Sequence, residues 1–181
     1  MTTEVKPTPA HDDDTARLAG IASTGSVAAL RAARADATRY TQGSFDALFD
    51  PSTTGLSLDE RFAAASYAAA LSAAPEAAHA YRERLLALGS SAESAIAALE
   101  GFIAEGVVHA NAPDIDARLA AILKHTHALT TLTPTPEQSA LLRVKQAALS
   151  TPEIVALSQL VAFVTYQVRV VAALRALEAS A

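Results

Sequence analysis

Glu60 and His79 are the two side chains of this 181-residue chain whose types and spacing point most directly to chemistry. They flank Ser72 and Pro75 in the frame E-x11-S-x2-P-x3-H. A carboxylate and an imidazole can pass a proton to or from a bound molecule, so the pair is a candidate acid and base. The chain contains no cysteine, which excludes disulfides, thiolate metal ligands and thiol redox chemistry.

The frame resembles the motif E-x11-C-x2-C-x3-H of the alkylhydroperoxidase D-like superfamily, which includes the carboxymuconolactone decarboxylases. In its peroxidase members the two cysteines form a redox pair, and the glutamate and histidine relay the proton that keeps the attacking sulfur a thiolate. Ser72 and Pro75 stand at the cysteine positions, so we expect both to be inactive and peroxidase activity to be lost. A second segment, residues 154–169, is similar to the C-terminal helix of a cysteine-free, peroxidase-related subgroup.

This resemblance implies an all-α, alkylhydroperoxidase D-like fold and a homo-oligomer, with a cysteine-bearing relative as a possible protein partner. Two functions remain open. The first is a non-redox accessory or binding protein of a peroxidase-related system. The second is a cofactor-independent acid–base enzyme of the decarboxylase, lyase or isomerase type, in which Glu60 and His79 act on a small unsaturated acid. Neither function requires a cofactor or a metal.

The residues of the frame also have structural interpretations. Glu60 shares a helix face with Tyr67, but Ser57-x-x-Glu60 also matches a capping box, and the two roles are compatible. His79 falls on the side of its helix opposite the apolar stripe, in solvent, in a cleft or against a second subunit. Ser72 is expected to cap a helix, because a Ser72–His79 pair along one helix would be about 10 Å apart.

Other polar residues are weaker candidates. Tyr67, Arg82 and Arg169 are candidate ligand-binding residues, and Arg169 is expected to need a carboxylate partner such as Glu60 or Glu153, or a contact across a subunit interface. Two histidines at 125 and 127 would diverge on a helix, so we predict no metal site there.

Composition limits the class of protein. Hydrophobic residues make up 51% of the chain and aromatic residues 5%, and alanine is abundant, which favours helices over strands. The formal net charge of −5 and the lack of a basic stripe argue against nucleic-acid binding. The N-terminus has the pattern of neither a signal peptide nor a transit peptide, so we expect a cytoplasmic protein. Polar residues within 154–174 favour a buried or interface helix over a membrane span.

The candidate residues must be positioned by helices. We expect a flexible arm over 1–14 and one helical domain over 15–181, with weakly repeated half-units at about 50–106 and 113–181. The repeat rests on Leu56-Ser-Leu-Asp-Glu60 and Leu149-Ser-Thr-Pro-Glu153, each of which opens an amphipathic run.

The residues Asp12 to Thr15 could cap a short first helix. Further helices are predicted at about 27–49 with Ser26 as N-cap and an irregularity at Gly43, and at 58–71, 75–88, 91–104, 113–129, 136–148 and 152–178.

Overall fold

The computed structural model describes residues 13–53, 55–131 and 138–180, and these residues form helices, turns and loops without a strand. The predicted all-α class is therefore confirmed for the described part of the chain. The structure divides into two compact units, one containing 13–48 and 169–180 and the other containing 49–168. Residues 1–12 of the predicted arm lie outside the described residues. The predicted half-units stay a prediction.

The first unit begins with a capped helix, as the acidic run suggested. Asp13 caps α1 (Asp14–Ala19) by accepting a hydrogen bond from the Ala16 backbone N–H, and Gly20 ends α1 in the left-handed conformation. Helices α2 (Ser26–Ala33) and α3 (Ala35–Leu48) follow. The predicted 27–49 helix is thus interrupted at Arg34 rather than at Gly43, and the N-cap is Gly25 rather than Ser26.

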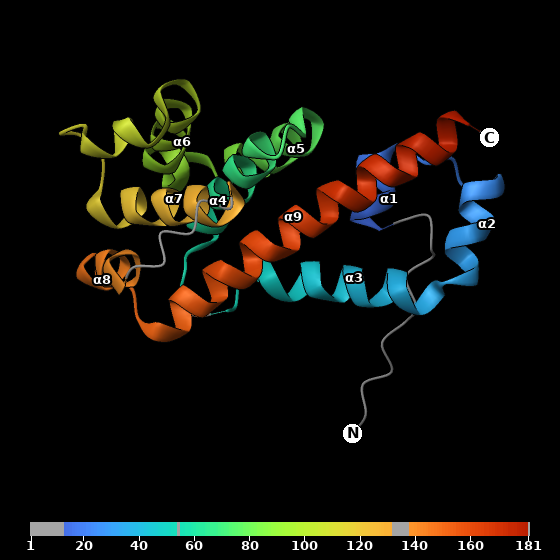
Figure 1. Ribbon diagram of the computed structural model, residues 1–181, viewed down its shortest axis with the longest axis horizontal. Helices are drawn as coiled ribbons and strands as arrows, with labels where there is room; N and C mark the ends of the chain where they lie inside the picture. Colours follow the sequence, from blue (N-terminus) through green and yellow to red (C-terminus); the bar gives the residue numbers. More distant parts are fainter. Residues whose placement is uncertain (1–12, 54, 132–137, 181) are drawn as a thin grey trace. The chain divides into compact units, whose positions relative to one another are not determined.

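The second unit is a group of helices arranged around α4 (Leu58–Leu71). Its members are α5 (Pro75–Leu86), η1 (Gly89–Ala92), α6 (Glu93–Glu105), η2 (Gly106–Asn111), α7 (Ala117–Thr130), α8 (Gln138–Gln146) and the first part of α9 (Thr151–Ala179). Helix α4 contacts α5, α6 and α7. Figure 1 shows α9 as one unbroken helix, which confirms the long helix predicted over 152–178.

Alanine explains why α4 can lie at the centre of this unit. Its residues 61–69 are all buried, including five alanines with no exposed surface at all: Ala63, Ala64, Ala65, Ala68 and Ala69. Alanine has the highest helix propensity, and its small side chain lets neighbouring helices approach closely. A helix that is apolar on every side must be covered on every side.

One predicted boundary in this unit is wrong, and one short element was not predicted. Pro113 does not begin α7; the helix begins at Ala117, where the Asp116 carboxylate accepts a hydrogen bond from the Leu119 backbone N–H at 2.9 Å. The sequence pattern also did not predict η2, the 3-10 segment between α6 and α7. An aspartate three residues past Pro113 offered a better N-cap, because its carboxylate satisfies a backbone N–H.

Helix α9 is long and apolar enough to cross a membrane by length and composition. Half of its most apolar 18-residue window is buried within the protein. A core helix of a soluble protein meets the same criterion, so α9 is weak evidence for a membrane span.

Candidate functional site

Glu60 lies in the first turn of α4, where it closes a capping box with Ser57. Its carboxylate accepts a hydrogen bond from the Ser57 backbone N–H at 2.9 Å. The same arrangement recurs at the start of α9, where Glu153 accepts from the Ser150 backbone N–H at 2.7 Å and from its hydroxyl at 2.6 Å. The two similar segments noted in the sequence therefore perform the same local task.

Arg118 of α7 joins these two capping boxes. Its Nε lies 2.7 Å from Glu60 Oε1, and its Nη2 lies 2.6 Å from Glu153 Oε1. The hydrogen bond to Glu60 is the largest of the effects that raise the pKa of Arg118. Hydrogen bonds from the Ser150 side chain and backbone, followed by the one from Arg118, lower the pKa of Glu153 to about 2. The Glu153 carboxylate is thus held as an anion, first by the Ser150 hydrogen bonds and then by the Arg118 guanidinium.

This arrangement corrects the carboxylate partners predicted for Arg169, while the alternative contact across a subunit interface stays a prediction. The carboxylates named as partners of Arg169, Glu60 and Glu153, are both bound by Arg118. Arg169 is exposed on α9 and does not need a buried partner. Helical periodicity did not place Arg169 on the exposed side because α9 is apolar around most of its circumference.

Ser72 and Pro75 occupy the connection between α4 and α5. Ser72 is the C-cap of α4, and its hydroxyl donates to the Ala68 carbonyl at 2.8 Å. Pro75 is the first residue of α5, where its missing N–H costs little. Capping, the role expected for Ser72, is confirmed.

His79 and Glu60 have different partners. The His79 side chain is 68% exposed, and its Nε2 lies 3.5 Å from Glu83 on the next turn of α5. Among the contacts of the described residues, none joins His79 to Glu60. The exposed side predicted for His79 is confirmed.

Arg82, a candidate ligand-binding residue, forms an ion pair with Glu100 of α6.

Arg61, another basic residue close to Glu60 in sequence, is committed to the loop before α4. It is buried, and it donates to the backbone carbonyls of Leu56 at 2.9 Å, Asp50 at 3.0 Å and Thr53 at 3.0 Å. Desolvation lowers the pKa of Arg61. Backbone carbonyls compensate much of the cost of burying its charge, so Arg61 stabilises the loop.

Tyr67 points away from solvent, toward α7. Its hydroxyl lies 3.0 Å from His127 Nδ1, and burial raises the pKa of Tyr67. His125 makes a different contact, with Nε2 lying 3.4 Å from Ser158 Oγ of α9. The two histidines therefore contact different residues, Tyr67 and Ser158. Within the described ranges, no group of three or more metal-ligating side chains lies together.

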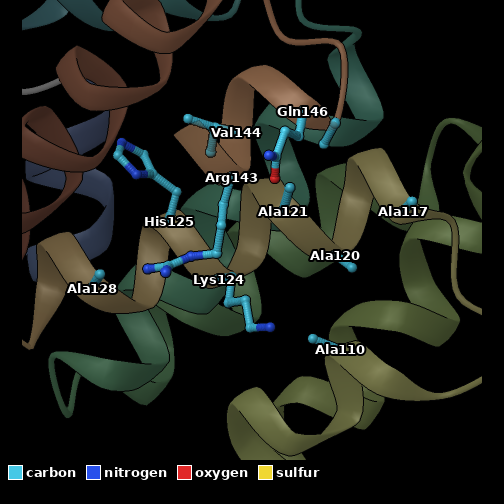
Figure 2. A pocket seen from close by; sticks show the side chains of 11 residues that line it. Ala110, Ala117, Ala120, Ala121, Lys124, His125, Ala128, Arg143, Val144 and Gln146 are labelled. Atoms are coloured by element: carbon cyan, nitrogen blue, oxygen red, sulfur yellow. The ribbon is translucent and has the colours of Figure 1, made fainter. Parts of the chain in front are cut away.

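A cavity of about 320 Å³ lies between α7, α8 and η2. Most of its wall is alanine, and its polar residues are Lys124 and His125 of α7 together with Arg143 and Gln146 of α8. Figure 2 shows Arg143 extending from α8 toward α7, with Ala110 contributed by η2. Desolvation lowers the pKa of His125, so the imidazole is neutral near pH 7. None of the sequence-predicted site residues lines this cavity.

Sequence reasoning missed Lys124 and Arg143, although a signal was present. Residues 117–152 contain Arg118, Lys124, Arg143 and Lys145 but only one acidic residue, Glu137. Neither Lys124 nor Arg143 has an acidic residue three or four positions away, so neither can form the usual intrahelical ion pair. Basic residues without an intrahelical acidic partner on an alanine-rich helix face are a sequence signal for a positively charged surface.

No protein-family model, curated protein or solved structure matches this chain.

Proposed function

We propose that this protein is a non-redox binding protein, of the alkylhydroperoxidase D-like type, that holds a small and largely apolar molecule between α7 and α8. The observation that carries the proposal is the alanine-lined cavity of about 320 Å³. Binding pockets for small molecules begin at roughly 300 Å³ and are mainly apolar with a few polar groups. The cavity has both properties.

The family resemblance supports the non-redox part of this proposal. Ser72 and Pro75 lie together at the α4–α5 connection, and neither has a thiol. Without a thiolate, a hydroperoxide has no sulfur to oxidise. The alternative function, an acid–base enzyme, has less support than the binding protein. Its two candidate residues have separate partners, because Glu60 is bound to Arg118 while His79 is exposed beside Glu83.

The test is a calorimetric titration of the protein with benzamide and, separately, with benzoate. Molecules of this size are expected to bind with a dissociation constant on the order of 1 mM or below. Ala121→Trp fills the cavity with an indole and should abolish binding of both compounds. Ala97→Trp, on the exposed face of α6, is the matched control and should bind as the unmodified protein does.

Thermal unfolding of each variant checks that it is folded, and Ala128→Trp on the same cavity wall provides a second test if Ala121→Trp misfolds. The proposal fails if neither compound binds, or if the tryptophan variants of the cavity bind as well as the control.

A further inference from the structure

Two basic side chains line the cavity, Lys124 and Arg143, and no ion pair joins either of them to another described residue. No acidic residue is among the described residues that line the cavity. By contrast, Arg118 and Arg82 form ion pairs, and Arg61 is bound to backbone carbonyls. Positive charge beside an apolar wall favours an anion over a cation.

We infer that the ligand of this cavity is a small organic carboxylate whose apolar body packs on the alanines of α7 and whose negative charge is attracted by Lys124 and Arg143. This inference rests on the proposed binding function. It adds the chemical class of the ligand.

The alanine lining separates an organic carboxylate from an inorganic anion. Ala117, Ala120, Ala121 and Ala128 offer methyl groups, which gain nothing from a hydrated phosphate but gain contact area with a hydrocarbon body. A guanidinium presents a planar pair of N–H donors that matches the two oxygens of a carboxylate. A cavity of about 320 Å³ has room for a body the size of one aromatic ring.

His125 does not add a third charge near pH 7, because desolvation lowers its pKa. The preference for an anion therefore depends on Lys124 and Arg143.

Three isosteric probes test the inference. Benzoate, benzamide and benzamidine share one ring and a planar head group but carry a negative charge, no charge and a positive charge. Calorimetric titration at low ionic strength should show benzoate binding about tenfold more tightly than benzamide, with benzamidine weakest. Inorganic phosphate, used as a fourth probe, should bind more weakly than benzoate.

Variants assign the preference to residues. Lys124→Gln and Arg143→Gln should each reduce benzoate affinity several-fold while leaving benzamide affinity almost unchanged. Lys145→Gln removes an exposed charge two residues from Arg143 that does not line the cavity, so it should retain the preference.

The outcomes distinguish the two proposals. Equal affinity for benzoate and benzamide would overturn the carboxylate inference and leave the binding function standing. Phosphate binding as tightly as benzoate would overturn it in favour of an inorganic anion. Loss of the preference in Lys145→Gln to the same extent as in Arg143→Gln would show a general charge effect and would also overturn it. If no probe binds, the proposed function itself fails.

Discussion

Arg118 contacts both of the similar segments recognised in the sequence. It binds Glu60 at the start of α4 and Glu153 at the start of α9, and each glutamate also closes the capping box of its own helix. The Arg118 and Glu side chains are partly buried, so these pairs are less screened by solvent than surface ion pairs. We therefore interpret this arrangement as a structural connection between three helices of the second unit.

Because of Glu153, the free energy of unfolding should decrease as the pH falls from 4.5 toward 2. The pKa of Glu153 is about 2 in the folded protein against an ordinary value of 4.5, so its contribution is complete above pH 4.5 and is lost as the pH falls toward 2. Glu153→Gln should lower the free energy of unfolding at pH 7. Its difference from the unmodified protein should shrink between pH 4.5 and 2.

Chemical denaturation at a series of pH values is the measurement. Asp114→Asn, a change in an exposed turn, is the control and should leave the pH profile unchanged. A constant difference between Glu153→Gln and the unmodified protein from pH 7 to pH 2 would show that the carboxylate charge has no stabilising role.

At the residue scale, local roles were predictable and distant partners were not. Ser57 and Glu60 are three residues apart, so their capping box follows from local spacing. Arg118 is far from both glutamates in sequence, and only the packing of α7 against α4 brings it close. The same limit applies to Lys124 and Arg143, whose common cavity depends on how α7 and α8 pack.

At the element scale, a glycine determines how η2 packs on α6. A Cβ added at Gly101 would lie 2.1 Å from His109 Nε2, well inside van der Waals contact. The His109 ring also packs edge-on against Phe102, with ring centroids 5.9 Å apart. A side chain at position 101 would therefore displace the His109 ring from its place between α6 and η2.

Gly101→Ala should destabilise the protein, because the His109 ring must move and lose its contact with Phe102. The expected loss is about 1–3 kcal/mol in the free energy of unfolding. Gly43→Ala is the control, since nothing lies within 4 Å of its added Cβ and its helix should gain about 0.5–1 kcal/mol. Denaturation followed by circular dichroism measures both.

A double variant assigns the effect to the proposed contact. His109→Ala should remove most of the additional penalty of Gly101→Ala, because the clash no longer exists. An equally large penalty in both backgrounds would mean that the clash with His109 is not the cause.

The sequence predicted helix boundaries correctly where a single strong pattern, such as a capping box, defined the segment. Helix α4 was placed correctly because a capping box opens it and an alanine run follows. The prediction over 27–49 failed at its interruption, since Gly43 is tolerated within α3 while the helix breaks at Arg34. A glycine in a helix costs only about 1 kcal/mol, so tertiary packing can override it.

At the scale of the whole molecule, we predict self-association through α9. Val155, Tyr166 and Leu177 are each about half exposed along this helix. Large apolar side chains exposed along one side of a helix favour burial against another surface, and closed symmetry would place equivalent helices together. Light scattering at micromolar concentration should give a mass above that of the 18.7 kDa chain.

The matched variant for this prediction is Val155→Lys, which places a charge on the exposed side of α9. It should lower the measured mass while leaving the helical circular dichroism signal unchanged. A monomer mass for the unmodified protein, with the protein folded and soluble, would contradict self-association.

Alanine-methyl NMR can show whether a small organic anion binds in the alanine-lined cavity. In protein labelled at the alanine methyl carbons, benzoate should shift the signals of Ala117, Ala120, Ala121 and Ala128 in a saturable manner. The signals of Ala63 and Ala64, which are fully buried in α4, should remain unchanged. Saturable shifts confined to α4, or no shifts at millimolar benzoate, would show that benzoate does not bind in this cavity.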